Sequence, residues 1–322
     1  MRRQARLFLV IFFVAWVALG ALAQRRSNQV TFTEFPVPTP KSGIQCITTG
    51  LDGAMWFVEP PANQVGRITT DGTITEFPLP NPDSYPRGIA VGPDGMIFFG
   101  ELKGNRIGRI TPDGTITEFN VPTRNSGPRG VTAGPDGALW FTMKNANRIG
   151  RMTMDGSFTS YRVPTARSVL ENIKTGPDGA LWFTEEAGER IGRITTSGVV
   201  TEYPLPTPGA SPDIMTRGPD GAMWFTEFEG DRIGRISMDG VFTEYPLPKS
   251  GSVPAGIVAG PDGALWFAEF FGNRIGRITT DGLISEYKVP TARSMPANIT
   301  LGPDGALWFS ELQGNKVGRL QP

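Results

Sequence analysis

The sequence predicts an all-β fold: a seven-bladed β-propeller of four-stranded antiparallel blades. A pattern that reads Gly-Pro-Asp-Gly-Ala-Leu-Trp-Phe in its commonest form occurs seven times at a constant spacing of 42 residues. Strand-rich repeats of about this length are typical of propellers. The 41 Gly and 29 Pro interrupt the chain too often for long helices. The first glycines of the seven copies are Gly50, Gly92, Gly134, Gly176, Gly218, Gly260 and Gly302.

Each repeat divides into four short strands, as the sixth copy illustrates. Residues 256–259 lead into the turn Pro261-Asp262-Gly263, and residues 264–269 return with alternating apolar and aromatic side chains. Residues 274–278 follow a loop, and a second Asp-Gly turn leads into residues 283–287. This order predicts an antiparallel meander that forms one blade.

The two ends of the chain are expected to close the ring. The seventh repeat stops after Val317-Gly318-Arg319-Leu320 and lacks the Thr-Glu-Phe strand that completes the earlier repeats. That motif occurs instead at residues 31–35, ahead of the first repeat. We therefore predict that the N-terminal strand completes blade seven, which removes the exposed sheet edges where the first and last blades meet.

Residues 1–23 read as a secretory signal peptide. Arg2, Arg3 and Arg6 precede an apolar run over residues 7–20, and Ala21-Leu22-Ala23 forms a small-residue cleavage site. An uncleaved anchor is the alternative, but the run is shorter than the roughly 20 residues that a membrane span needs. We expect residues 24–322 to form one propeller domain, exported to the periplasm or the extracellular space, with no membrane span after cleavage.

Composition excludes several functions. Without residues 1–23 the chain carries 28 basic and 31 acidic residues, a net charge of −3, which does not suit binding to nucleic acid. It has one cysteine, Cys46, which we interpret as a packing residue, and no histidine. Ser-His-Asp triads and Cys/His metal sites are therefore ruled out. We expect a monomer.

Residues that recur in every blade are interpreted as scaffold. Six blades have Trp at one position, Phe98 replaces it in the second blade, and Phe follows in all seven. These aromatic residues are expected to pack between blades, with ligand stacking as the alternative. An arginine that recurs from Arg67 to Arg319 is expected to pair with glutamates on the following strand, such as Glu76.

Two sets of positions are expected to surround the central channel on the face opposite the Asp-Gly turns. The residues that begin the innermost strands are Gln45, Arg87, Arg129, Glu171, Asp213, Ala255 and Ala297. The residues that end the second strands are Glu59, Glu101, Met143, Glu185, Glu227, Glu269 and Glu311. The first set varies between blades, and variable connections at one end of a scaffold carry binding sites. We predict a ligand-binding mouth containing Arg87, Arg129, Glu171, Asp213, Glu185, Glu227 and Glu269.

The repeats resemble a known family. Gly-Pro-Asp-Gly-Ala-Leu-Trp-Phe-Thr-Glu, Asn-Arg-Ile-Gly-Arg-Ile-Thr and Thr-Glu-Phe-Pro-Leu-Pro are similar to motifs of the virginiamycin B lyase (streptogramin lyase) family, over residues 31–320. The resemblance implies a seven-bladed propeller. It also implies a magnesium-dependent elimination that opens cyclic depsipeptide antibiotics of the streptogramin B type at an ester C–O bond.

The site residues that the resemblance implies are present only in part. The family's glutamate falls on Glu311, a candidate catalytic residue, whereas its two histidine positions fall on Ala255 and Ala297. Elimination needs a base, and alanine offers neither a lone pair nor a proton. As a hypothesis, Glu171, Asp213, Glu185 and Glu227 could bind Mg²⁺ or Ca²⁺ through carboxylate oxygens; the alternative is that they pair with nearby arginines or stay solvated.

Three functions follow from these residues. The first is an exported propeller of the virginiamycin B lyase type that binds a small molecule, glycan or peptide at its mouth. The second is a divergent metal-dependent C–O lyase acting on cyclic depsipeptide lactones, and the third is a lactonase-like hydrolase. The absence of histidine favours the first.

Overall fold

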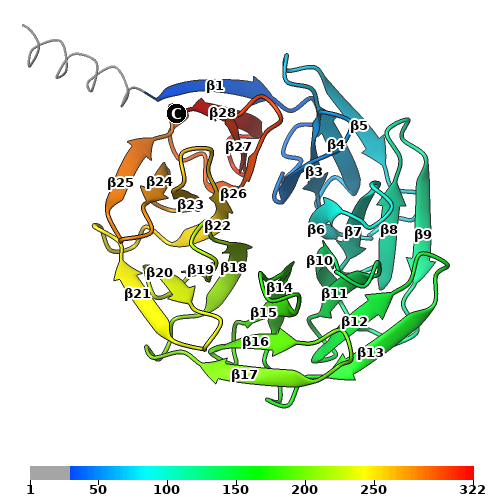
Figure 1. The fold of residues 1–322 in the computed structure, drawn as a ribbon. Helices are drawn as coiled ribbons and strands as arrows, with labels where there is room; N and C mark the ends of the chain where they lie inside the picture. The colour runs from blue at the N-terminus through cyan, green and yellow to red at the C-terminus, as the bar shows by residue number, and fades with distance from the viewer. Residues whose placement is uncertain (1–29) are drawn as a thin grey trace, which may run out of the picture.

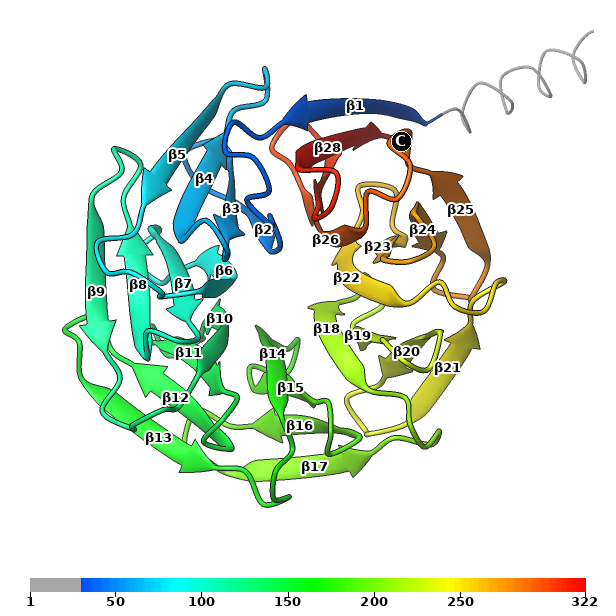
Figure 2. The same cartoon turned by 180° about the vertical axis from the view of Figure 1, so that it is seen from behind.

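The computed structural model describes residues 30–322, which form a ring of seven four-stranded sheets (Figures 1 and 2). No helix occurs among these residues, so none there could span a membrane. Blade one contains β2 (Ile47–Thr49), β3 (Met55–Glu59), β4 (Gln64–Ile68) and β5 (Ile74–Pro78). Blade two contains β6 (Pro86–Val91), β7 (Ile97–Glu101), β8 (Arg106–Ile110) and β9 (Ile116–Asn120). Blade three contains β10 (Pro128–Ala133), β11 (Leu139–Met143), β12 (Arg148–Met152) and β13 (Phe158–Arg162).

The remaining blades repeat this order around the ring. Blade four contains β14 (Leu170–Thr175), β15 (Leu181–Glu185), β16 (Arg190–Ile194) and β17 (Val200–Pro204). Blade five contains β18 (Pro212–Arg217), β19 (Met223–Glu227), β20 (Arg232–Ile236) and β21 (Phe242–Pro246). Blade six contains β22 (Pro254–Ala259), β23 (Leu265–Glu269), β24 (Arg274–Ile278) and β25 (Ile284–Lys288). Blade seven contains β26 (Pro296–Leu301), β27 (Leu307–Glu311), β28 (Lys316–Gln321) and β1 (Thr31–Pro36).

The N-terminal strand closes the ring, as the sequence predicts. β1 pairs antiparallel with β28, from Thr31 opposite Gln321 to Pro36 opposite Lys316. The Asn315 amide also donates hydrogen bonds to the carbonyls of Val37 and Thr39, at 3.0 and 3.1 Å. The first and the last strand of the described chain are therefore hydrogen-bonded to each other. The predicted signal peptide, residues 1–23, lies outside the described residues.

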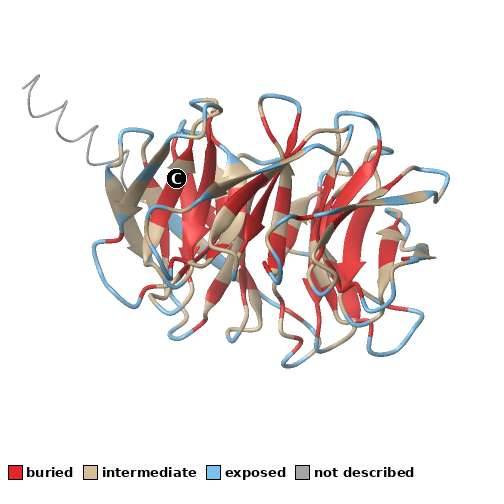
Figure 3. Cartoon of the chain, turned by 90° about the horizontal axis from the view of Figure 1, so that it is seen from below, coloured by how far each residue is buried: buried red, intermediate tan, exposed pale blue. Residues whose placement is uncertain are grey.

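The core lies between neighbouring blades, and Figure 3 shows that the buried residues lie on the strands. The six tryptophans within residues 30–322 are at most 1% exposed, and each stacks on a Phe or Tyr of its blade's outermost strand. Phe57 crosses the third strand at Gly66, where an added Cβ would lie 2.1 Å from its ring. Only glycine fits under the aromatic side chain at that position.

The recurring arginines pair with the aspartates of the first turns and not with the glutamates of the outer strands, which corrects the expected pairing. Arg67 Nε lies 2.7 Å from the Asp52 carboxylate, and the Trp56 indole donates a 3.1 Å hydrogen bond to the same carboxylate. This arrangement lowers the pKa of Asp52, because the bonds from Arg67 and Trp56 outweigh the effect of burial. Glu76 instead accepts hydrogen bonds from the backbone N–H and hydroxyl of Thr39, at 3.0 and 2.8 Å.

Candidate functional site

A cavity of ≈ 200 Å³ lies at one mouth of the central channel. All seven residues predicted to begin the innermost strands line it, and they lie beside the first residue of each strand or just before it: Gln45, Arg87, Arg129, Glu171, Asp213, Ala255 and Ala297. The structure thus brings Arg87, Arg129, Glu171 and Asp213 together, as the mouth prediction expects. The half-buried Cys46 lies in the same wall, and burial raises the pKa of its thiol.

A β-bulge turns these side chains toward the cavity. In blade six Pro254 pairs with Glu269 and Ile257 with Phe267, so two residues, Ala255 and Gly256, face the single residue Ala268. The same register shift occurs near the start of β6, β10, β14, β18 and β26. A bulge bends the strand and re-aims its side chains. The hairpin predicted from the sequence contains no extra residue and places Ala255, not Pro254, opposite Glu269.

Hydroxyl groups tie the bulge of one blade to the next. Thr142 accepts a 2.9 Å hydrogen bond from the Gly130 N–H and donates one of 3.1 Å to the Glu171 carbonyl. Thr184 links the Asn172 N–H to the Asp213 carbonyl in the same way, at 3.0 and 2.7 Å. The mouth residues are therefore held by a repeated backbone bridge.

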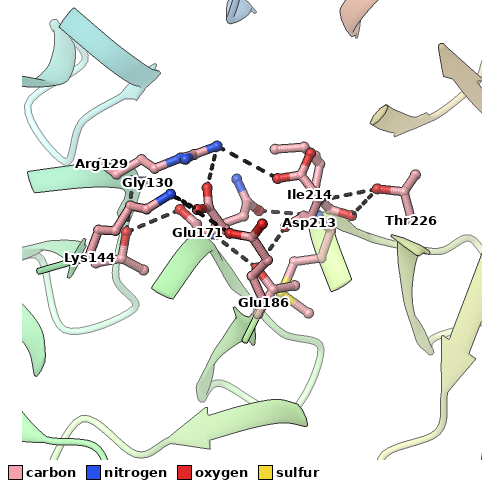
Figure 4. A network of polar contacts seen from close by, with 12 residues as sticks. Arg129, Gly130, Lys144, Glu171, Glu186, Asp213, Ile214 and Thr226 are labelled. Atoms are coloured by element: carbon pink, nitrogen blue, oxygen red, sulfur yellow. Dashed lines mark hydrogen bonds and ion pairs between the residues drawn. The ribbon is translucent and has the colours of Figure 1, made fainter. Parts of the chain in front are cut away.

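One half of the mouth is a charged network, shown in Figure 4. The Glu171 carboxylate contacts both Arg129 and Lys144. Arg129 lies 3.8 Å from Asp213, and Lys144 lies 3.7 Å from Glu186. Burial raises the pKa of Asp213 despite the opposing charge of Arg129, and burial also lowers the pKa of Lys144. Two cations thus pair with the three carboxylates of this network.

Arg87 differs from the other charged groups of the mouth. Within residues 30–322 it forms no ion pair, and its buried Nε has no hydrogen-bond partner. Its guanidinium lies 5.0 Å from the ring centroid of Tyr85, whose ring also contacts the Lys103 ammonium at 4.5 Å. Arg87 is therefore a cation placed at the cavity with free donor capacity.

The other half of the mouth is apolar. Phe228, Phe270 and Leu312 line the cavity beside Ala255 and Ala297. The rings of Phe228 and Phe270 lie 6.2 Å apart between centroids. Sequence reasoning missed this wall. The sequence signal for this wall is the residue directly after each second strand, which varies between blades. On the charged side this residue is Lys144 in blade three and Glu186 in blade four.

The outgoing glutamates do not line this cavity, which corrects the two-ring arrangement. Glu185, Glu227, Glu269 and Glu311 are 0% exposed and lie inside their blades. The Glu311 carboxylate, for example, packs against Gly314. Burial, reinforced by the charge of Glu34, raises the pKa of Glu311 to about 7. The candidate catalytic residue is therefore buried away from the cavity.

The comparisons with known proteins agree with this architecture. A family model described as the Virginiamycin B lyase family matches residues 12–212 and 125–322. The chain belongs to the virginiamycin B lyase family. A solved streptogramin B lyase structure is 41% identical, with a TM-score of 0.87, and the alignment covers 91% of this chain and 97% of that one.

Two further comparisons differ in how much of the chain they cover. A catalytically inactive histidine-to-alanine variant of virginiamycin B lyase from Staphylococcus aureus, solved with quinupristin, is 40% identical with a TM-score of 0.87. That alignment covers 91% of this chain and all (100%) of that one. The match to virginiamycin B lyase from Bordetella pertussis is 42% identical over 45 residues, only 14% of this chain and 15% of that protein.

The virginiamycin B lyase likeness raises the question of a divalent metal, and the residues at the mouth do not fit one. Among residues 30–322 no group of three or more acidic or sulfur ligands has the geometry of a metal site. Glu171 and Asp213 reach the cavity, but both contact Arg129. Glu185 and Glu227 are buried inside other parts of their blades. The four carboxylates of the metal hypothesis therefore do not converge.

Proposed function

We propose that this chain is a binding protein of the virginiamycin B lyase family that holds a small amphipathic ligand at its mouth and does not open it by elimination. The observation that carries the proposal is the composition of the cavity. A charged wall with the unpaired Arg87 faces an apolar wall, and Ala255 and Ala297 occupy the positions where the family resemblance implies histidines. The mouth can thus contact both polar and apolar groups but offers no imidazole base.

A relative supports the separation of binding from catalysis. The Staphylococcus aureus variant with alanine in place of one histidine is catalytically inactive and was solved with quinupristin. The family resemblance implies that this chain has alanine at both histidine positions, and the chain is 40% identical to that variant over the aligned 91% of its length. We infer that a cyclic depsipeptide, or another peptide, glycan or small molecule with one apolar side, is the class of ligand to test first.

The contacts of the mouth indicate how such a ligand would be oriented. A carbonyl or carboxylate group would accept hydrogen bonds from Arg87, whose guanidinium is already positioned by Tyr85. Apolar or aromatic ligand groups would pack against Phe228 and Phe270. Binding would therefore combine one charge-assisted contact with apolar burial.

The lyase and hydrolase alternatives lack a supporting observation in the cavity. Each requires a base or an activated water, and the carboxylates that reach the cavity are Glu171 and Asp213. Both contact Arg129, so their charge is engaged in the network. Glu311 is 0% exposed and so is not placed to contact a ligand in the mouth.

Quinupristin with the purified protein tests the proposal directly. We expect saturable 1:1 binding by titration calorimetry and an unchanged compound by chromatography with mass spectrometry after long incubation with Mg²⁺. A product of unchanged mass but altered retention would show elimination, and a gain of one water would show hydrolysis. Either product would overturn the noncatalytic assignment, and absence of binding would overturn quinupristin-like ligands as the class.

We further propose that the protein is exported to the periplasm or the extracellular space, because residues 1–23 have the pattern of a secretory signal peptide, and that it is a monomer. Cell fractionation and mass spectrometry of the native protein would check this. The expected mature protein begins at Gln24 and elutes as a monomer in size-exclusion chromatography. A cytoplasmic protein that retains Met1 would contradict the proposal, and so would a stable oligomer. The chain without residues 1–23 carries 28 basic and 31 acidic residues, a net charge of −3, so we expect no nucleic-acid binding.

A further inference from the structure

Blade two differs from the other six blades at its central aromatic residue. Phe98 occupies the position that is Trp elsewhere. In the six other blades the indole N–H donates a hydrogen bond to the aspartate of the first turn, at 2.9 to 3.1 Å. Phenylalanine has no such donor. Within the described residues, the corresponding oxygen of Asp94 accepts its hydrogen bond from the Met96 N–H, at 3.0 Å.

The outer aromatic residue of blade two is also placed differently. In the six Trp blades the outer Phe or Tyr stacks on the indole with centroids 5.5 to 5.7 Å apart. Within residues 30–322, Phe119 forms no such stack with Phe98. A Cβ added at Gly156 would lie 3.5 Å from Phe119, whereas one added at Gly114 would lie 2.3 Å from the equivalent Phe77. Phe119 therefore lies farther from the turn of the next blade than Phe77 does.

These two differences accompany a cavity of ≈ 200 Å³ between blades two and three. It is lined by Asp94, Phe98, Arg109, Phe119, Met152 and Met154. Asp94 belongs to the turn that joins β6 to β7, so the cavity lies at the end of the blade opposite the mouth. It is separate from the site proposed above.

The walls of this cavity retain the groups that surround an indole elsewhere in the ring. Asp94 and Arg109 form an ion pair of 2.8 Å, as the equivalent residues do in the other blades. In five Trp blades the arginine lies 5.7 to 6.0 Å from the indole centroid. Two phenylalanine rings and two methionines complete the lining, and thioethers pack well against aromatic rings.

We propose that this cavity is an accessory binding site for a planar bicyclic aromatic molecule with a ring N–H, of the indole type. The ring N–H would donate to the Asp94 carboxylate, Arg109 would cover the ring face, and Met152 and Met154 would contact its edge. By volume alone, ≈ 200 Å³ exceeds the roughly 150 Å³ that accommodates benzene and leaves room for a fused ring.

Free indole is the probe, titrated into the full-length mature protein by calorimetry. We expect one saturable site, and we expect Phe98→Trp to abolish it because the new side chain fills the space as Trp does in the other six blades. Met154→Phe, at a 37% exposed position, is a second variant expected to weaken binding by narrowing the opening. Met238→Phe, at the equivalent position beside the Trp-containing blade four, is the matched control and should bind indole as the wild type does.

Benzofuran tests the role of the N–H, since it has the same shape and no ring donor. We expect its affinity to be roughly tenfold lower than that of indole, the effect of losing one hydrogen bond to a charged acceptor. The proposal is overturned if indole does not saturate at millimolar concentration, or if Phe98→Trp and Met154→Phe bind it unchanged. Equal affinities for indole and benzofuran would overturn the assignment of the ligand class.

Discussion

The two sets of mouth-side positions in the seven blades have opposite properties. The residues that begin the innermost strands vary from Arg129 to Ala297 and line the cavity. The residues that end the second strands are glutamate in six blades, and Glu227 and Glu311 are 0% exposed within their blades. Recurrence of a charge in a repeat protein therefore identifies a structural position here, whereas variation identifies the surface that a ligand can reach.

Removing the carboxylate that joins two cations should have the largest effect on stability. Glu171 is 2% exposed and contacts Arg129 and Lys144, which are 21% and 27% exposed. Loss of one partner from a fully buried pair costs roughly 3–5 kcal/mol. Because these cations are partly solvated, we expect Glu171→Ala to lower the free energy of unfolding by about 2 kcal/mol.

Chemical denaturation measures this effect, with Gln45→Ala as the control. Gln45 occupies the same position in blade one and carries no charge. Equal destabilisation by the two substitutions would contradict the idea that the charged network, and not the position alone, supports this half of the mouth.

The buried glutamates should make the protein more stable at mildly acidic pH. Burial, with the charge of Glu244, raises the pKa of Glu227 to about 8, and burial raises that of Glu185 to about 7. The folded state therefore holds protons that the unfolded chain releases above the ordinary value of 4.5. The resulting stability is complete below that value and is lost as the pH rises through 7 to 8.

Thermal unfolding of Glu227→Gln tests this sign. The amide cannot ionise. The variant's free energy of unfolding should therefore exceed that of the wild type at pH 8, by on the order of 1–3 kcal/mol, and equal it near pH 5. The exposed Glu229, two residues away, is the control, and Glu229→Gln should leave the pH profile unchanged. A wild-type protein that becomes more stable between pH 5 and pH 8 would contradict the prediction.

The sequence predicts the blades well because their determinants are local. The turn residues, the alternating strands and the Thr-Glu-Phe motif of residues 31–35 each define one element, and β1 closes blade seven as expected. The site was predicted only in part, since a one-residue bulge at Ala255 and Gly256 decides which side chains face the channel. Nothing in the residue types alone places Glu311 inside a blade or Phe270 in the mouth.

Loss of the unpaired cation should weaken ligand binding more modestly. Arg87 has donor capacity at the cavity, and a charge-assisted hydrogen bond contributes about 1.5–3 kcal/mol. We expect Arg87→Ala to weaken quinupristin binding by roughly tenfold or more in titration calorimetry. Arg124→Ala, in an exposed loop on the same face, should have no effect. Equal losses for both variants would point to general electrostatic attraction instead of a contact made by Arg87.

Divalent cations should have the smallest effect, because the two carboxylates that reach the cavity are already neutralised. A hard cation needs several oxygen ligands, and binding to Glu171 and Asp213 would require displacing Arg129 and Lys144. We therefore expect millimolar Mg²⁺ or Ca²⁺ to leave the melting temperature and quinupristin affinity unchanged. A rise in melting temperature with Mg²⁺ that disappears in Asp213→Ala would instead show that the metal outcompetes the cations. The charged half of the mouth would then be a metal site, and the comparison of its carboxylates with the glutamates buried in the blades would have to be revised.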